Sequence, residues 1–326
     1  MSATQPIKVL VVGASPDALN INTEQRGFLA RGFGDLLPPD CVKNTSLELG
    51  PQTAMDFSPN LILVFGSCCP DQCEYVPLRR AAESVGAHLA FWLHDDPYEF
   101  DYGFKVVEFA DTIFTNDRWA LEHYRAGRVF HLPMAACPHT HYCDLETFPE
   151  KSFDIFFAGA AFENRINMIR DLLPTLRRYR TCIRGSGWPD ELPIAQNRWI
   201  ANRDLPKFFA QSRVVLNLGR DFDLGNERYR LPATTPGPRT FEAAMAGCVQ
   251  LYFLTGLEIE EYFTPGEEIL LFDHASDVSE LVACMVGDPE RARRIAAASQ
   301  KRALDEHSYA ARAKRILQVC FDGGSS

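Results

Sequence analysis

Three consecutive polar residues, His94, Asp95 and Asp96, form the first group in the chain that is suited to acid–base chemistry. They directly follow an apolar run at 88–93 that predicts a buried strand. Adjacent carboxylates raise each other's proton affinity, and beside a histidine they are suited to deprotonate or hold hydroxyl groups. The alternative interpretation is a capped turn, because Asp before Pro97 is common in turns.

A second group lies at 236–253, where a Pro-Gly turn precedes a predicted helix and a buried strand. The turn ends at Gly237, and Arg239, Thr240 and Glu242 occupy the start of the helix. Backbone N–H groups at a helix start attract anions, so this entrance suits a ligand that carries phosphates and a ribose. The alternative is an ordinary helix on which Arg239 and Glu242 pair at the surface.

The second half of the chain opens with another strand, glycine loop and helix. A strand at 154–159 ends in Gly159, and Arg165 lies at the mouth of the next helix, where a diphosphate would sit. Arg184 precedes two glycines that would let a ligand approach closely, with Trp188 as a wall. The alternatives are a surface ion pair for Arg165 and a buried packing role for Trp188.

The elements that must position these groups alternate between strand and helix. Strands are expected at 8–13, 61–66, 88–93, 112–115 and 129–132, and then at 154–159, 180–183, 214–218, 248–253 and 268–272. In open parallel sheets the carboxyl ends of the strands line the ligand site. The pattern therefore predicts an α/β protein of two Rossmann-like domains. We expect the domains at 1–145 and 146–326, with the last helix packing back on the first domain.

Composition and charge exclude several classes of protein. The net charge of −10 argues against a general nucleic-acid binder, because phosphate neutralisation needs a basic surface. The N-terminus lacks a charged segment followed by an apolar run, and the longest apolar runs are strand-sized. We therefore expect no signal peptide, no membrane span and a cytoplasmic location.

Ten cysteines are many for 326 residues, but most lie in apolar settings, where cysteine acts as a small hydrophobe. Two groups have residue types that bind metals, namely Cys68, Cys69 and Cys73, and Cys137, His139, His141 and Cys143. Neither has the paired CxxC spacing of a zinc site. We therefore expect no metal and no cofactor.

A family resemblance rests on three segments, PGPRTFEAAMAGCVQLYF at 236–253, EEYFTPGEEILLFD at 260–273 and DPERARRIAAASQKRALDEHSYAARAKRIL at 288–317. Together they resemble the C-terminal domain of bacterial CgeB-like glycosyltransferases, which are related to the family 1 and 4 type enzymes of the GT-B fold. HDDP and TIFTNDR, at 94–97 and 112–118, are similar to the N-terminal half of the same group.

The resemblance implies two Rossmann-like domains that face each other across a cleft and a metal-independent sugar transfer from a nucleoside-diphosphate sugar. It implies that Gly159 and Arg165 take the diphosphate with Arg239 nearby, that Glu242 contacts the ribose, and that HDDP faces the acceptor. The family has a pair of glutamates eight positions apart, of which Glu242 matches the second, and Thr234 stands where the first would be, so retention and inversion at the anomeric carbon both remain open.

Two other functions remain compatible with the sequence. A nucleotide-sugar epimerase of the same fold would act on the donor alone, and a non-catalytic coat or assembly protein would keep only the fold. The identity of the acceptor and the oligomeric state are left open.

Overall fold

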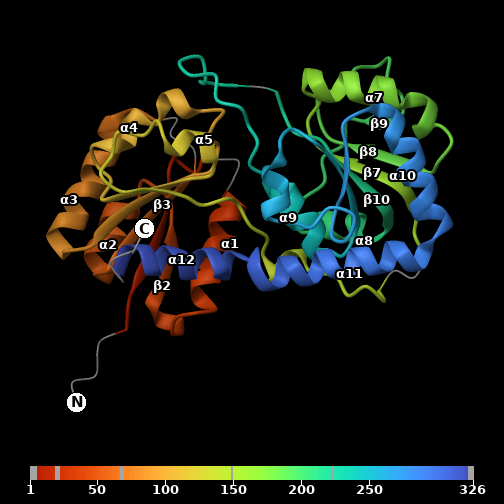
Figure 1. The fold of residues 1–326 in the computed structure, drawn as a ribbon. Helices are drawn as coiled ribbons and strands as arrows, with labels where there is room; N and C mark the ends of the chain where they lie inside the picture. Colours follow the sequence, from red (N-terminus) through yellow and green to blue (C-terminus); the bar gives the residue numbers. More distant parts are fainter. Residues whose placement is uncertain (1–5, 19–22, 67–69, 148–149, 222, 322–326) are drawn as a thin grey trace. The chain divides into compact units, whose positions relative to one another are not determined.

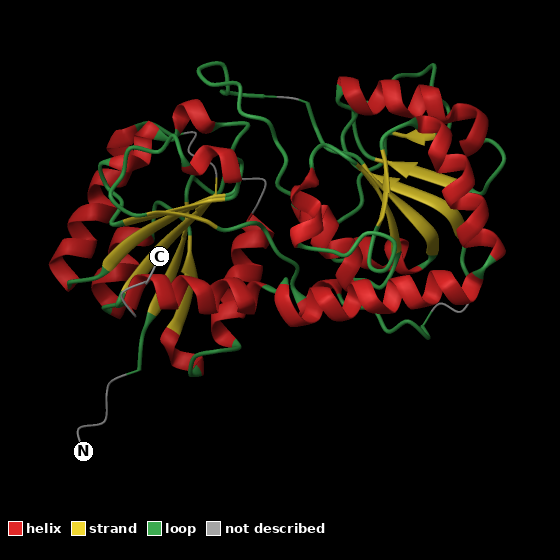
Figure 2. Cartoon of the chain, in the orientation of Figure 1, coloured by secondary structure: helices red, strands yellow, loops and turns green. Residues whose placement is uncertain are grey.

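The computed structural model describes residues 6–18, 23–66, 70–147, 150–221 and 223–321. The chain forms two compact units, each built on a six-stranded parallel sheet with helices on both faces (Figures 1 and 2). The N-terminal unit comprises 1–134, 223–235 and 309–326, and the C-terminal unit comprises 135–222 and 236–308. The prediction of an α/β protein with two Rossmann-like sheets is confirmed.

The sheet of the N-terminal unit has the strand order β2-β1-β3-β4-β5-β6. Its strands are β1 (Val9–Gly13), β2 (Val42–Thr45), β3 (Leu61–Gly66), β4 (His88–Leu93), β5 (Thr112–Thr115) and β6 (Val129–His131). Five of these agree with the predicted strands to within one residue at each end. The sequence analysis missed β2, because its VKNT sequence is polar and its side chains are partly or fully exposed at the edge of the sheet.

Helices cover both faces of this sheet. Leu10 and Val12 pack in one apolar cluster with residues of α2 and α3. On the other face, the ring of Tyr309 in α12 lies 6.1 Å from that of Phe28 in α1 and 6.3 Å from that of Trp92 in β4. The helices of this unit are α1 (Thr23–Gly34), α2 (Gly50–Phe57), α3 (Val76–Val85), α4 (Phe104–Val107), α5 (Arg118–Leu121) and α12 (Tyr309–Phe321), with 3-10 turns η1 (Pro39–Cys41), η2 (Gln72–Tyr75) and η3 (Phe100–Tyr102).

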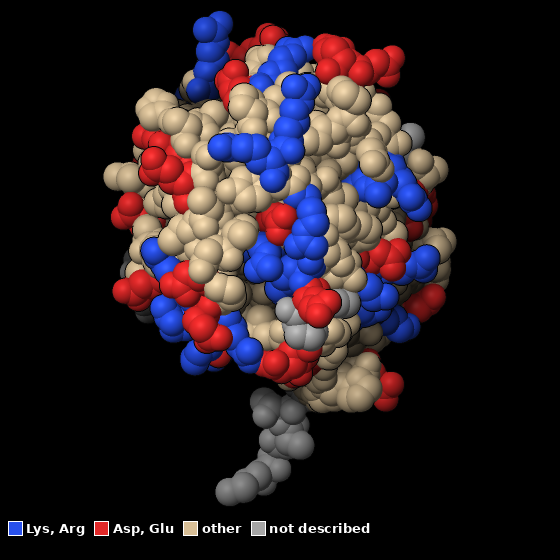
Figure 3. Space-filling model, turned by 90° about the vertical axis from the view of Figure 1, so that its right-hand side faces the viewer, with Lys and Arg blue, Asp and Glu red and all other residues tan. Residues whose placement is uncertain are grey.

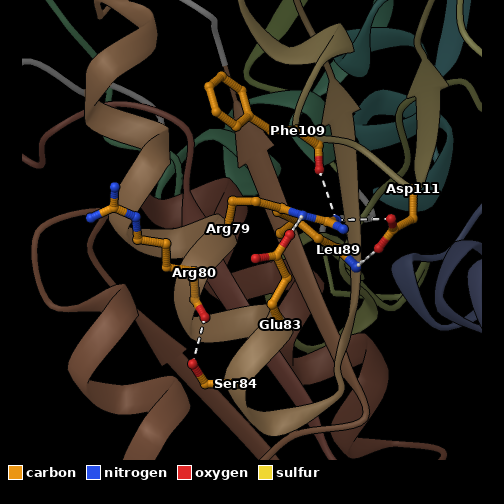
Figure 4. Close-up of polar contacts among 7 residues, drawn as sticks. All are labelled: Arg79, Arg80, Glu83, Ser84, Leu89, Phe109 and Asp111. Carbon is orange, nitrogen blue, oxygen red and sulfur yellow. Dashed lines mark hydrogen bonds and ion pairs between the residues drawn. The ribbon is translucent and has the colours of Figure 1, made fainter.

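A polar network ties α3 to the loop between β4 and β5 (Figure 4). Arg79 donates to Glu83 at 2.9 Å, to Asp111 at 2.8 Å and to the carbonyl of Phe109 at 3.1 Å. The carboxylate of Asp111 also accepts the Leu89 N–H at 2.8 Å. One carboxylate therefore joins a helix to the start of a central strand.

The sheet of the C-terminal unit has the order β12-β11-β10-β7-β8-β9. Its strands are β7 (Phe153–Ala158), β8 (Thr181–Arg184), β9 (Ala195–Gln196), β10 (Ser212–Asn217), β11 (Val249–Phe253) and β12 (Leu270–Phe272). The predicted strands are present, with ends that differ by up to two residues. Two-residue β9 was missed because so short a strand carries no periodic signal.

Two apolar layers enclose this second sheet. One contains Ile169 and Leu172 of α7 with Val278 and Val282 of α10, and the other contains Phe209 of α8 together with residues of α9. The helices of the unit are α6 (Pro138–His141), α7 (Glu163–Leu176), α8 (Leu205–Ala210), α9 (Pro238–Met245), α10 (Ala275–Gly287) and α11 (Pro289–Glu306), with the 3-10 turn η4 (Leu257–Glu261).

Surface charge concerns the expectation that the chain is no general nucleic-acid binder, and helix hydropathy concerns the expectation that it has no membrane span. On the face shown in Figure 3, acidic side chains interrupt a central column of Lys and Arg. Within the described part of the chain, every helix is too short or too polar to cross a bilayer.

The contact between α1 and α12 gives a stability prediction. A Cβ at Gly32 would lie 2.5 Å from the backbone of Tyr309, whereas one at Gly34 in the same helix would meet no atom within 4 Å. We expect Gly32→Ala to lower the free energy of unfolding by about 1–3 kcal/mol, because backbone must move apart. Gly34→Ala should be neutral or slightly stabilising. Urea unfolding of the full chain measures both, and equal effects at the two positions would contradict the prediction.

Candidate functional site

Glycine-rich loops at the carboxyl edge of the C-terminal sheet pack tightly against one another. Gly159 follows β7, and its N–H donates to the carbonyl of Arg184, the last residue of β8, at 2.9 Å. The indole N–H of Trp188 donates to the Gly159 carbonyl at 3.2 Å. A Cβ at Gly185 would lie 1.8 Å from that same carbonyl oxygen, so the approach requires glycine. Trp188 is buried and packs in the core, as the alternative interpretation of this residue proposed.

The guanidinium of Arg165 binds backbone carbonyls in the neighbouring loops. It donates to Ala160 O at 3.0 Å, to Leu218 O at 3.0 Å and to Gly219 O at 2.9 Å. The sequence analysis predicted that this side chain binds a diphosphate. In the structure it holds the loop after β7 beside the end of β10.

A carboxylate occupies the start of α7, where the sequence analysis placed a diphosphate. The backbone N–H of Asn164 donates to Asp221 Oδ2 at 3.0 Å, and its side-chain amide donates to the Gly219 carbonyl at 3.2 Å. Helix starts stabilise negative charge, so Asp221 is favourably placed there. The chain therefore supplies its own anion at this position.

Thr240 lies inside the unit, at the centre of a hydrogen-bonded group. Its hydroxyl accepts from Asn217 Nδ2 at 2.9 Å, and its carbonyl accepts from Gln250 Nε2 at 2.9 Å. Asn217 Nδ2 also donates to Gln250 Oε1 at 3.0 Å. Thr240 is only 1% exposed, and these bonds anchor α9 to β10 and β11. Sequence reasoning missed Asn217 and Gln250, although each is a polar residue in an otherwise apolar strand.

Glu242 is also buried, with a residue exposure of 2%. Arg239 donates to its Oε2, and His141 Nε2 lies 3.8 Å from its Oε1. Burial is the largest single influence and raises the pKa of Glu242. The charges of Arg239 and His141 together lower it by more, so the pKa lies below its usual range. His141 is itself oriented by the Cys137 N–H, which donates to Nδ1 at 2.9 Å. Arg239 and Glu242 form the pair of the alternative interpretation, but Glu242 lies in the interior of the unit and not at its surface.

Two cations of this edge retain capacity to bind an anion. The Arg239 side chain is 36% exposed at the start of α9, where Gly237 is the N-cap residue and leaves open space around its Cα. The Nε and Nη1 atoms of Arg184 are buried and have no hydrogen-bond partner among the described residues. An unpaired buried donor is costly, so these two nitrogens are suited to donate hydrogen bonds to acceptor atoms of a ligand.

Arg184 lines a cavity of about 350 Å³ beside α8. Arg198 and Lys207 line it as well, and the only acid among its lining residues is Asp204. Trp199, which is 71% exposed, adds an aromatic face. Cations next to an exposed aromatic ring suit an anionic ligand that contains a planar ring.

His94, Asp95 and Asp96 follow β4 of the N-terminal unit and have different surroundings. His94 Nδ1 lies 3.3 Å from Asp95 Oδ2, and the histidine ring meets the Phe65 ring edge-on at 5.1 Å. The Asp95 side chain is 23% exposed, whereas the Asp96 residue is 3% exposed. His94 is itself buried, so Asp95 is the residue of this stretch that retains contact with solvent.

Asp96 is held by two hydroxyl groups inside the unit. Thr115 Oγ1 donates to Asp96 Oδ2 at 2.6 Å, and the Tyr124 hydroxyl donates to the same oxygen at 2.8 Å. Burial is the largest influence and raises the pKa of Asp96 to about 7 in spite of these bonds. This burial does not favour the predicted contact of Asp96 with an acceptor.

The cysteine and histidine groups build no metal site in the described part of the chain. There, no three His, Cys, Asp or Glu side chains are grouped so that they could hold a metal ion. His141 and Cys137 bind each other, as described above. Cys68 and Cys69 lie outside the described residues.

Comparison with known proteins shows which family and which folds the chain resembles. Residues 165–318 match the family described as glycosyl transferase-like. No curated protein sequence matches the chain. The prediction of a glycosyltransferase is therefore confirmed at the level of enzyme class, while the CgeB-like subgroup remains a prediction.

Solved structures show the same fold over nearly the whole chain. HepE of Anabaena, in complex with UDP and glucose, has a TM-score of 0.62 at 12% identity, with 96% of this chain and 99% of HepE covered. Sucrose-phosphate synthase of Thermosynechococcus elongatus has a TM-score of 0.62 at 13% identity, with coverage of 96% and 98%. A UDP-N-acetylglucosamine 2-epimerase has a TM-score of 0.51 at 15% identity, with coverage of 99% and 98%. The fold is that of GT-B glycosyltransferases.

The raised pKa of Asp96 predicts a pH-dependent stability. Between pH 3.8 and about 7 the folded chain keeps a proton that the unfolded chain releases, so stability should fall as the pH rises through this window. The slope attributable to Asp96 approaches about 1.4 kcal/mol per pH unit. Asp96→Asn keeps an acceptor for Thr115 and carries no such proton.

Urea unfolding of both proteins at several pH values between 4.5 and 8.5 tests this assignment, because the contributions of groups that do not interact with Asp96 cancel in the difference. We expect Asp96→Asn to gain stability relative to the unmodified chain as the pH rises to about 7, and the difference to level off above it. A difference that does not vary with pH would show that Asp96 titrates normally.

Proposed function

We propose that the chain transfers a sugar from a nucleoside-diphosphate sugar, and that the C-terminal unit binds this donor at the carboxyl edge of its sheet. One observation carries the proposal. The segment that matches the glycosyl transferase-like family, 165–318, contains the partly exposed Arg239 and also Arg184, whose Nε and Nη1 atoms have no hydrogen-bond partner among the residues that the structure describes. The complex of HepE with UDP and glucose supports a donor of this class.

The residues of this edge then divide into ligand-binding and positioning residues. Arg239 would hold the diphosphate, because it is partly exposed and lies in the first turn of α9. Arg184 would bind acceptor atoms of the nucleotide from within its cavity. Arg165, Thr240 and Glu242 would position the loops and α9 from below.

The leaving diphosphate gains negative charge as the bond to the sugar breaks. The start of α9 and the guanidinium of Arg239 would offset this charge without a metal ion. Fixed dipoles and cations are effective here because they need no rearrangement during the reaction. A metal-independent transfer is therefore part of the proposal.

The N-terminal unit would supply the acceptor side. Asp95 is the more exposed carboxylate of the HDDP stretch, and His94 orients it from 3.3 Å. Together they would hold or deprotonate an acceptor hydroxyl. Thr234 accepts a hydrogen bond from Trp119 Nε1 at 2.9 Å and is no base, so the proposal extends to both stereochemical outcomes.

An epimerase is the second candidate, supported by the likeness to UDP-N-acetylglucosamine 2-epimerase. It would change the donor without any acceptor, so product analysis in the absence of an acceptor separates the two. A coat or assembly protein would bind no donor at all in calorimetry. The cytoplasmic location stays a prediction.

Replacement of Arg239 tests the donor site. A thermal-shift screen of UDP-, GDP-, ADP- and dTDP-sugars first selects the donor, and a screen with no shift would show the proposed function to be wrong. For the selected donor, we expect Arg239→Ala to raise Kd by about tenfold or more, since a charge-assisted bond contributes about 1.5–3 kcal/mol. Arg239→Lys, which retains the charge beside Glu242, should fall between Ala and the unmodified chain.

A matched arginine controls for a general loss of charge. Arg170 pairs with Glu191 at 2.7 Å on the exposed side of the same unit. Arg170→Ala should leave the donor Kd unchanged in calorimetry. If it weakens binding as much as Arg239→Ala, then Arg239 has no specific role at the site.

Replacement of Asp221 tests whether its carboxylate competes with the donor. We expect Asp221→Asn to lower the donor Kd by about three- to tenfold at low salt, because it removes a negative charge from the start of α7. The gain should shrink in 0.5 M NaCl. The exposed Asp190 of the same unit provides the control variant, Asp190→Asn. Weaker binding by Asp221→Asn would mean that this carboxylate assists the ligand.

A further inference from the structure

Most of the chain between β10 and α9 folds as part of the N-terminal unit. Residues 223–235, called the β10–α9 segment below, belong to the N-terminal unit, whereas β10 and α9 belong to the C-terminal unit. A loop of this length without secondary structure of its own is often functional. Its last residue is bonded directly to Pro236, which opens the turn at the start of α9. Any contact that fixes the segment therefore fixes the chain that enters α9.

The carboxylate of Asp101 anchors the middle of the segment. Its Oδ2 accepts the backbone N–H of Glu227 at 2.7 Å and that of Arg228 at 3.2 Å. The N–H of Asp101 in turn donates to the Gly225 carbonyl at 2.7 Å. One residue thus satisfies three backbone groups of the segment, two of them through charge-assisted bonds.

The first residues of the segment pair with the backbone just before Asp101. The Tyr98 carbonyl accepts from the N–H groups of Leu224 and Gly225 at 2.9 and 2.8 Å. The Tyr102 hydroxyl donates to the Leu224 carbonyl at 3.1 Å. A Cβ at Gly225 would lie 2.9 Å from the Tyr102 ring, so this close approach depends on glycine.

Apolar contacts and a local ring of hydrogen bonds support the same docked position. The Tyr229 ring stacks on His123 at 4.2 Å and meets Phe100 edge-on at 5.8 Å. Leu231 is 7% exposed and packs with Phe100. Asn226 closes the loop, because its side-chain amide both donates to and accepts from the backbone of Leu231 at 2.9 Å.

The end of the segment is held at the start of α5. Trp119 Nε1 donates to Thr234 Oγ1 at 2.9 Å, and the Arg118 N–H donates to Thr235 Oγ1 at 3.2 Å. Gly237, the N-cap residue of α9, lies two residues further along, and Arg239 follows in the first turn. A restraint at Thr235 is therefore transmitted through four covalently linked residues to the cation proposed to hold the diphosphate.

We propose that Asp101 is a positioning residue for donor binding, which pins the β10–α9 segment to the N-terminal unit and so fixes the entrance of α9. The inference rests on the proposed function, because it takes Arg239 as the residue that binds the donor diphosphate. If the segment were released, donor binding would have to order it, and ordering a flexible loop reduces affinity. Asp101 thus acts through Arg239 and does not touch the donor.

Two substitutions at Asp101 in the full chain test the proposal through two measurements. Limited trypsin digestion, followed by mass spectrometry, reports cleavage after the exposed Arg228 and Arg230, and calorimetry with the selected nucleotide sugar reports the donor Kd. We expect Asp101→Ala to accelerate both cleavages and to raise Kd, each by about tenfold. Asp101→Asn should stay within about threefold of the unmodified chain, because its amide oxygen still accepts the two N–H groups.

Asp111→Ala is the matched control. Asp111 is also a carboxylate of the N-terminal unit that accepts a backbone N–H, but it joins Arg79 to Leu89 (Figure 4). We expect this variant to lose thermal stability without faster cleavage after Arg228 and Arg230 and without a change in donor Kd. If Asp111→Ala and Asp101→Ala change the cleavage rate and the donor Kd equally, Asp101 contributes only to the general stability of the unit and the proposal is overturned.

The two measurements also separate this inference from the proposed function. Unchanged cleavage in Asp101→Ala would show that Asp101 does not pin the segment. Faster cleavage with an unchanged Kd would show that the β10–α9 segment does not position α9 for donor binding. If the unmodified chain binds no nucleotide sugar, the proposed function fails and takes the positioning role with it, even if the digestion still shows that the segment is pinned.

Discussion

The backbone at the carboxyl edge of the C-terminal sheet must satisfy its polar groups without help from a regular ladder. Strands end there, and their last carbonyls would be unpaired if side chains did not reach them. Arg165 donates hydrogen bonds to backbone carbonyls in the loops after β7 and β10. The glycines at 159 and 185 then allow those loops to touch. The shape of the proposed donor site follows from this pairing.

A second set of buried groups holds the helix that enters this edge. Asn217, Thr240 and Gln250 form a closed hydrogen-bonded group, and Glu242 lies between Arg239 and His141. Buried polar groups without partners are costly, so each member fixes its neighbours. The result is a rigid α9 with its partly exposed cation at the start. Rigid support of this kind is what electrostatic stabilisation of a leaving group requires.

The main features of the fold could be predicted from the sequence. Apolar runs such as 61–66 and 88–93 are strands because a strand between two helical layers must be apolar on both faces. Strands β2 and β9 could not be found in this way, since an edge strand is polar on exposed positions and a two-residue strand has no period. The choice of the carboxyl edge of the C-terminal sheet as the candidate site also followed from the spacing of glycine and arginine residues. Spacing did not show which side chains at that edge are buried.

What the sequence determined by itself is therefore the alternation of strands and helices and the placement of polar groups after strand ends. Both depend on local periodicity, which any stretch of chain expresses without its neighbours. Only the tertiary structure decided that Arg165 binds carbonyls, that Asp96 and Glu242 are buried, and that residues 223–235 fold against Asp101. These outcomes depend on partners that are distant in the chain, such as Leu218 for Arg165 and Thr115 for Asp96. Burial and pairing are properties of the assembled unit, so no local pattern encodes them.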